Sequence, residues 1–158
     1  IIDWVVNLAQ QDFLTITLIG GEPILTDEYI YFLQQCEEKN IHSNISLILN
    51  SNISTIDYGS INSIEHWQKF HRVEVYPSID GLNTVGEYIR HGFIQAKFDK
   101  NFNLIKSFVN FLSVTLQLYN IYEMPRLFKY AENNNVKIHF SFLVEPTYLS
   151  IHLFDYLF

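Results

Sequence analysis

The sequence predicts an α/β fold built on parallel β-strands, for three reasons. Five short apolar runs have the length of β-strands, and the segments between them carry apolar residues at helical spacing. This alternation is typical of successive β-α-β units. No linker rich in Gly, Ser or Pro divides the 158 residues, a length typical of one domain. The pattern fits an open parallel sheet or part of a (β/α) barrel, and in both the functional residues lie at the carboxyl ends of the strands.

The predicted strands end at glycine or polar residues, and their side chains alternate between two faces. The clearest case is the last strand, in which apolar residues occupy every second position from Val136 to Val144. In chain order we expect strands at residues 13–19, 45–49, 73–79, 114–118 and 136–144.

Helices are predicted between these strands from capping residues and apolar spacing. Thr26 is a suitable N-cap, and Asp27 and Glu28 follow in the first turn, where carboxylates favour the positive end of a helix. Pro125 suits the first turn of the last helix. In chain order we expect the end of a helix at residues 1–9, the helix after Thr26 with Tyr29, Leu33 and Cys36 buried, helices at about 61–70 and 101–112, and the helix at Pro125.

The composition is that of a folded protein without a polyanionic partner. Hydrophobic residues make up 48% and charged residues 17% of the chain, which is too apolar for a disordered segment. The net charge is −7 and the ten Lys and Arg residues are scattered, which disfavours nucleic acid and anionic membrane surfaces as partners. No run approaches the ~20 apolar residues of a membrane span. We also find no signal-peptide pattern, so a cytoplasmic location is expected.

Both ends of the sequence are apolar. It begins at Ile1, inside a helical pattern of apolar residues, and ends in the apolar stretch 153–158. A complete domain rarely begins and ends in this way. We therefore expect the chain to be a piece of a longer protein.

Polar residues gather at the carboxyl ends of the first three predicted strands. The segments are Gly20-Gly21-Glu22-Pro23, Asn50-Ser51-Asn52 and Ser78-Ile79-Asp80-Gly81. Taken singly, each is typical of an ordinary turn. Together, at three successive strand ends, they indicate a binding site in which glycine carbonyls and a carboxylate suit an ammonium group. Arg90, a little further on, suits a carboxylate.

These segments resemble motifs of the radical S-adenosylmethionine (SAM) enzymes. Gly20-Gly21-Glu22-Pro23 is similar to the GGEP motif after their second barrel strand, and Asn50-Ser51-Asn52 resembles the polar end of their third. Ser78-Ile79-Asp80-Gly81 resembles the S-x-D-G that ends their fourth strand. Glu87-Tyr88-Ile89-Arg90 is similar to the segment that places an Arg near SAM. Order and spacing agree from about residue 13 to residue 144.

The resemblance implies a partial (β/α)₆ barrel, with about five of its parallel strands in this chain. Residues 1–158 would form a radical SAM core that is incomplete at its N-terminus. The family's cluster motif, C-x-x-x-C-x-x-C, is absent, and Cys36 follows GGEP on an apolar helix face, so we expect Cys36 to be a core residue. The segment 145–151 resembles members with a C-terminal twitch domain, a shortened SPASM module, which we expect downstream of residue 158.

The resemblance also implies a SAM site. The methionine amino group would lie on the segment Gly20, Gly21, Glu22 and Pro23. Asn50, Asn52, Ser78 and Asp80 would line the pocket near ribose and methionine, and Arg90 would pair with the carboxylate of SAM.

The implied activity belongs to the intact enzyme. A [4Fe–4S] cluster, with ligands outside this chain, would reductively cleave SAM, and the resulting 5′-deoxyadenosyl radical would remove a hydrogen from the substrate. No residue of this chain would then be a catalytic acid or base. The chain alone is expected to be inactive, because it lacks the three cluster thiolates. Analogy within the family suggests a peptide or protein as substrate and an electron donor such as flavodoxin or ferredoxin.

Two other functions stay open from the residues alone. One is a degenerate, noncatalytic α/β barrel that binds a peptide or a partner protein. The other is an ordinary α/β enzyme that uses Glu22 and Asp80 as acid and base on a phosphorylated or sugar substrate. The six histidines show no H-x-x-x-H, HExxH or H-x-E spacing, so no metal site is predicted from them. His139 shares a face of the last strand with Lys137 and Ser141.

Overall fold

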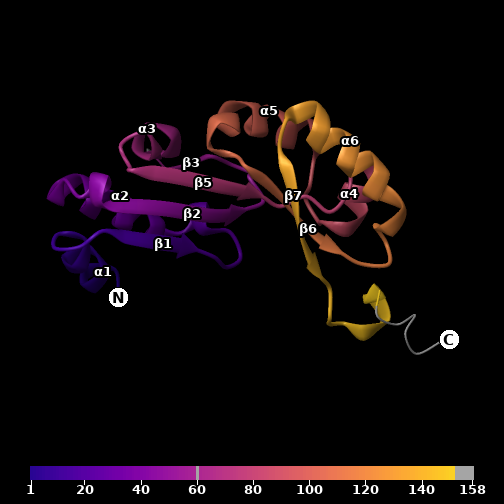
Figure 1. Ribbon diagram of the computed structural model, residues 1–158, viewed down its shortest axis with the longest axis horizontal. Helices are drawn as coiled ribbons and strands as arrows, with labels where there is room; N and C mark the ends of the chain where they lie inside the picture. Colours follow the sequence, from indigo (N-terminus) through magenta and orange to yellow (C-terminus); the bar gives the residue numbers. More distant parts are fainter. Residues whose placement is uncertain (60, 152–158) are drawn as a thin grey trace.

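The computed structural model describes residues 1–59 and 61–151 and shows an α/β fold (Figure 1). All five predicted strands are present: β1 (Leu14–Leu18), β2 (Ile45–Ser51), β5 (Arg72–Pro77), β6 (Phe111–Leu116) and β7 (Lys137–Phe142). The α-helices are α1 (Ile2–Ala9), α2 (Asp27–Lys39), α3 (Ser63–Trp67), α4 (Asn83–Ile89), α5 (Gln95–Ile105) and α6 (Met124–Asn134). Strands β3 (Asp57–Tyr58) and β4 (Ile61–Asn62) form a small antiparallel hairpin. The 3₁₀ helices are η1 (Pro23–Leu25), η2 (His42–Asn44), η3 (Lys106–Phe108), η4 (Ile121–Glu123) and η5 (Thr147–Leu149).

The long strands are parallel and follow one another in chain order. β1, β2 and β5 form one sheet in that order, and β6 and β7 form a second pair. Two isolated parallel bridges, Val75 to Val109 and Ser78 to Ser113, link β5 to the chain at β6. Figure 1 shows β6 and β7 running steeply across the direction of β1, β2 and β5. Among the described residues β1 and β7 remain edge strands, so these strands do not close a barrel.

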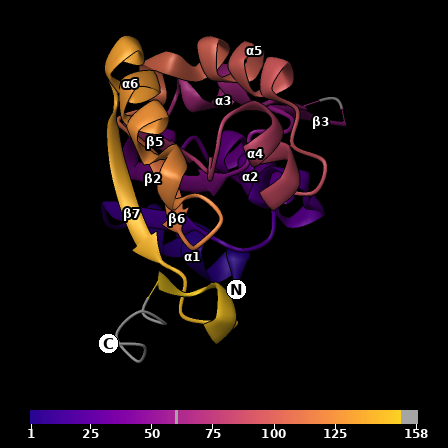
Figure 2. The ribbon, with the colours of Figure 1, turned by 90° about the vertical axis from the view of Figure 1, so that its right-hand side faces the viewer.

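Helices cover one face of the strands and form the core with it. In β2 the side chains of Ile45, Leu47 and Leu49 are buried on that face, and those between them are half-buried. The same core contains Trp67 of α3 and Phe102 of α5. Figure 2 shows β7 along one margin of the molecule with α6 beside it.

The local signals at two helices are confirmed. Oγ1 of Thr26 accepts a hydrogen bond from the backbone N–H of Tyr29 at 3.1 Å, and α2 ends at Asn40 in a left-handed conformation with φ of 51°. The predicted buried face of α2 is present. Pro125 lies in the first turn of α6 as expected.

Two predicted helices have other bounds. The helix expected at 101–112 is α5, which ends at Ile105, and the strand β6 begins at Phe111. The apolar spacing continues through Leu112 because this side chain is buried from a strand instead of a helix. The helix expected at 61–70 is α3, which is shorter and spans Ser63–Trp67. It begins after Asn62 because the side chain of Asn62 accepts hydrogen bonds from two backbone N–H groups of the first turn.

No helix among residues 1–59 and 61–151 combines the length and the hydropathy needed to cross a bilayer. The apolar stretch 153–158 lies outside the described residues.

Candidate functional site

The predicted site residues lie at one edge of the sheet. β1, β2 and β5 are parallel neighbours, so the segments that follow them emerge side by side. Gly20, Gly21 and Glu22 follow β1 and Pro23 begins η1; Asn50 lies in β2 and Asn52 follows it; Ser78 and Asp80 follow β5; Arg90 directly follows α4.

Glu22 joins the first of these segments to the second. Its Oε1 accepts a hydrogen bond from Oγ of Ser51 at 2.5 Å, and its Oε2 accepts one from the backbone N–H of Asn52 at 2.8 Å. The N–H of Ser78 in turn donates to the carbonyl of Ser51 at 2.8 Å. The three segments are therefore held in one layer. Sequence reasoning missed Ser51, because the period of two places it on the opposite side from Asn50.

Asp80 joins the third segment to Arg90 and to β6. Its Oδ2 accepts a hydrogen bond from Nε of Arg90 at 2.7 Å, and its Oδ1 accepts one from the N–H of Thr115 at 2.6 Å. Asp80 is only 5% exposed. A buried carboxylate is tolerated when a cation and hydrogen-bond donors compensate its lost hydration, and both are present.

Asn120 completes this polar layer and was not predicted. It is fully buried, and its Nδ2 donates to the carbonyls of Asp80 at 2.9 Å and Thr115 at 2.8 Å. Its Oδ1 accepts from the N–H of Gln117 at 2.9 Å. Its position in the sequence could have indicated it, because Asn120 follows the fourth parallel strand at the same edge as the other polar residues.

Two cavities open beside this layer. One, of about 430 Å³, is lined in part by Asn52, Ile53 and Arg90. The other, of about 740 Å³, is lined in part by the segment from Gly20 to Pro23 and by Leu18 of β1. Both volumes lie in the range of roughly 300–1,000 Å³ of small-molecule sites. Of the predicted residues, Asn52 and Arg90 thus line the first cavity and Gly20 to Pro23 line the second, whereas Asn50, Ser78 and Asp80 line neither.

The wall of the smaller cavity includes a strained residue. Ile53 has φ of 47°, in the left-handed region that a β-branched residue rarely adopts. Its carbonyl accepts a hydrogen bond from Nδ2 of the buried Asn101 in α5 at 2.7 Å, which helps to hold this conformation.

Three groups at this edge face open space or lack a partner. A Cβ atom added to Gly20 or to Gly21 would meet nothing within 4 Å, and Gly20 has φ of 144°, which favours glycine. Oδ1 of Asn50 is buried and has no hydrogen-bond partner among the described residues. A ligand with donor groups would satisfy such an acceptor.

Glu74 and Tyr76, two residues apart in β5, share one face of the strand. The hydroxyl of Tyr76 donates to Oε2 of Glu74 at 2.6 Å, and Arg72 forms an ion pair with the same carboxylate. The hydrogen bond to Glu74 raises the pKa of Tyr76. Tyr76 is paired with Asn50 in the register of β2 and β5. These polar side chains therefore lie next to the carboxyl ends of the two strands.

Cys36 is a core residue, as predicted. Its side chain is fully buried in α2, and burial raises the pKa of its thiol to about 12. A thiol in this state is neither a nucleophile nor a ready metal ligand.

A second group of polar side chains lies at the other edge of the sheet. Glu37, His42 and His66 bring their ligand atoms within 4.8 Å of one another. Burial lowers the pKa of His42, because it disfavours the charged imidazolium. Spacing along the chain did not predict this group, because its members come from three different elements.

Comparison with known proteins assigns no family to the chain. No protein-family model matches it, and no curated protein matches it. The resemblance to radical SAM enzymes therefore rests on the motif residues at the strand ends.

Proposed function

We propose that this chain is part of the core of a radical SAM enzyme, a partial (β/α)₆ barrel that binds SAM at the carboxyl ends of β1, β2 and β5. One observation carries the proposal. The three motif segments follow three adjacent parallel strands and are hydrogen-bonded to one another through Glu22 and Ser51. Parallel neighbours bring any such segments to one edge, and the bonds of Glu22 and Ser51 are what join these three there.

The glycine segment fits the amino group of SAM. The space above Gly20 and Gly21 is free of protein atoms within 4 Å of an added Cβ, so a ligand can approach their backbone closely. Glu22 adds negative charge beside this space, although both of its oxygens already accept hydrogen bonds. The carbonyls of this segment are therefore the main ligands in our proposal, and Glu22 positions the segment.

Arg90 fits the carboxylate of SAM. It contacts Asp80 through Nε, and the guanidinium carries further N–H donors on its terminal nitrogens. Arg90 and Asn52 line the cavity of about 430 Å³, whereas the glycine segment lines the one of about 740 Å³, so the methionine end of SAM would have to lie between the two. In this arrangement Asp80 fixes the orientation of Arg90, while Asn50, Asn52 and Ser78 supply hydrogen bonds near ribose and methionine.

SAM and a [4Fe–4S] cluster, when bound, supply hydrogen-atom abstraction. The part of this chain is to hold the methionine end of SAM and to keep water away from it. The cluster ligands must come from outside residues 1–158, since the one cysteine, Cys36, is buried and protonated. A peptide or protein substrate, and an electron donor such as flavodoxin or ferredoxin, belong to this proposal by analogy with the family.

The proposal is tested by calorimetric titration of the purified chain with SAM. Gly21→Ala and Arg90→Ala should each weaken SAM binding by about tenfold or more. Gly21→Ala is the sharper variant, because its methyl group meets no protein atom and so reports only on the ligand. Thr15→Ala, at the far end of β1 and exposed, is the matched control and should leave the affinity unchanged. Failure of the wild-type chain to bind SAM, or unchanged affinity in both variants, would refute the proposed pocket.

A noncatalytic peptide-binding barrel is the second candidate. The carboxylates of Glu22 and Asp80 are both engaged within the protein, which disfavours the acid–base enzyme and is equally compatible with this scaffold and with a radical SAM core. The coding sequence of the full-length protein separates the two candidates. An in-frame C-x-x-x-C-x-x-C about one βα unit (~30 residues) before Ile1 supports the radical SAM enzyme, and a readable stretch without it supports the scaffold.

A further inference from the structure

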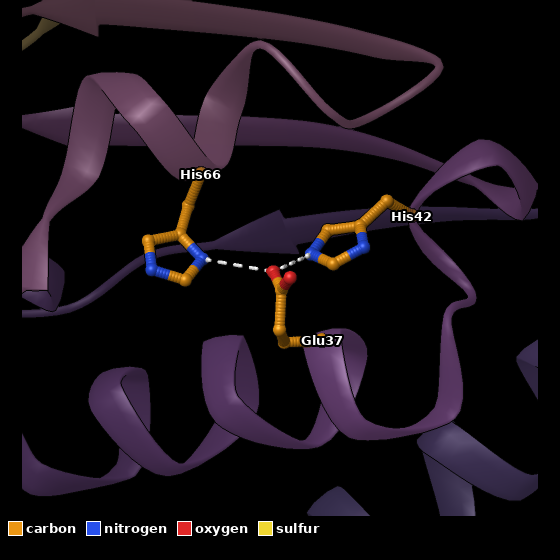
Figure 3. A group of neighbouring side chains, drawn as sticks. All are labelled: Glu37, His42 and His66. Carbon is orange, nitrogen blue, oxygen red and sulfur yellow. Dashed lines mark ion pairs between the residues drawn. The ribbon is translucent and has the colours of Figure 1, made fainter.

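Three side chains converge at the amino-terminal edge of the sheet, opposite the proposed SAM pocket. Glu37 lies near the end of α2, His42 begins η2 just before β2, and His66 belongs to α3 ahead of β5. Figure 3 shows that the three side chains point toward one another, with both imidazoles directed at the carboxylate.

Their spacing is close to that of a metal-binding site. Nε2 of His42 lies 3.7 Å from Oε2 of Glu37, and Nδ1 of His66 lies 3.8 Å from the same oxygen. Bonds of about 2.0–2.1 Å to a tetrahedral metal place the ligand atoms roughly 3.4 Å apart. The three ligand atoms all lie within 4.8 Å of one another, so side-chain rotations that draw the two imidazoles together would bring them to bonding distance of one ion.

The two imidazole nitrogens that face the carboxylate have no other role among the described residues. Nε2 of His42 and Nδ1 of His66 are buried, and neither has a hydrogen-bond partner there. His42 is only 5% exposed. A buried polar atom without a partner is costly to the folded state, and it calls for a ligand. A metal ion would satisfy both nitrogens at once.

We propose that Glu37, His42 and His66 bind a divalent transition-metal ion of the zinc class. Two imidazoles and one carboxylate suit Zn²⁺, whereas Mg²⁺ and Ca²⁺ prefer oxygen ligands throughout. A water molecule would complete the tetrahedron. Because the three ligands lie on α2, η2 and α3, the ion ties these elements together at the end of the sheet away from the strand-end ligand site. The inference is independent of the proposed function.

Lys69 is the competitor for this site. Its Nζ lies 2.6 Å from the same Oε2 of Glu37, and its side chain is 45% exposed. The ammonium group can therefore swing into solvent when an ion binds. Its charge opposes a second cation, so removal of Lys69 should strengthen metal binding.

The test is titration of the metal-free chain with Zn²⁺ by calorimetry, and with Co²⁺ by visible absorption. We expect one equivalent of Zn²⁺ to bind, and Co²⁺ to develop the intense visible bands of a tetrahedral site. Glu37→Gln and His66→Gln should each weaken Zn²⁺ binding by about tenfold or more, and Lys69→Met should tighten it. His91→Ala removes an exposed histidine outside the group and should change nothing.

Two outcomes would overturn the inference. One is the absence of Zn²⁺ binding in both the wild type and Lys69→Met, in which the competing charge is gone. The other is binding that survives unchanged in both Glu37→Gln and His66→Gln. Neither outcome depends on the folding of a His42 variant, and circular dichroism of each variant verifies that it is folded. A rise in the unfolding temperature on addition of Zn²⁺, lost in Glu37→Gln, is the independent supporting result.

Discussion

Arg90 donates a hydrogen bond through Nε to Oδ2 of Asp80 at 2.7 Å, and this pair joins the end of α4 to the loop after β5. The side chain of Asp80 is 6% exposed and that of Arg90 28%. The pair is therefore largely protected from water, and its two members depend on each other.

Removal of the Asp80 carboxylate should destabilise the protein strongly. Asp80→Ala leaves both Arg90 and the N–H of Thr115 without their partner, and we expect a loss of about 3 kcal/mol in the free energy of unfolding. Asp80→Asn keeps an acceptor for Thr115 and should lose less. Urea unfolding of both variants measures the difference. Equal losses would mean that the ion pair, and not the bond to Thr115, accounts for the effect.

Gly86→Ala should displace α4. A Cβ atom at Gly86 would collide with the carbonyl oxygen of Gly81 and lie 2.8 Å from the ring of Phe93. Overpacking of this kind costs about 1–3 kcal/mol, and it would move Arg90 away from Asp80. Urea unfolding gives the loss, with Gly21→Ala as the control, since its methyl group meets nothing within 4 Å. Full stability in Gly86→Ala would show that α4 is not packed against the loop after β5.

The buried Tyr29 should make stability fall between pH 10 and pH 12. Burial is the main cause that raises its pKa from 10.0 to about 12, and its hydroxyl accepts a hydrogen bond from Nε1 of Trp67 at 2.9 Å. In this window the unfolded state has released the phenolic proton and the folded state still holds it. The stabilisation present below pH 10 is therefore lost as the pH rises, by about 2–3 kcal/mol in total.

Urea unfolding just below pH 10 and near pH 12 measures this loss. The decline should be smaller in Tyr29→Phe than in the wild type. Tyr122→Phe, at a position 92% exposed, is the control and should keep the wild-type decline. The same decline in Tyr29→Phe would assign the effect to other groups.

Cys36 should resist alkylation in the folded protein. Its pKa of about 12 leaves almost no thiolate near neutral pH, and the side chain is fully buried. Iodoacetamide should modify it only after unfolding in urea, as mass spectrometry can show. Cys36→Ala should also leave the affinity for SAM unchanged. Rapid modification of the native chain would contradict the buried thiol.

Local sequence patterns predicted much of the fold because they report local preferences. Short apolar runs, alternating most clearly from Val136 to Val144, identified all five parallel strands, and the N-cap at Thr26 and the proline at Pro125 located two helices. The same patterns failed at residues 101–112, where Leu112 is buried from a strand. Apolar spacing indicates that a side chain is buried, but it does not distinguish a helix from a strand over a short segment. Here the segment is a strand because it pairs with β7, beginning with Phe111 opposite Lys137.

For the candidate site, the sequence by itself determined that Gly20 to Pro23, Asn50 to Asn52 and Ser78 to Gly81 meet at one edge, because parallel strands have their carboxyl ends on the same side. Only the tertiary structure decided which of these groups are already paired. The bonds of Glu22 to Ser51 and of Asp80 to Arg90 depend on side-chain positions across separate segments. The convergence of Glu37, His42 and His66 depends on how α2 and α3 pack beside β2. The spacing of residues along the chain does not predict that packing.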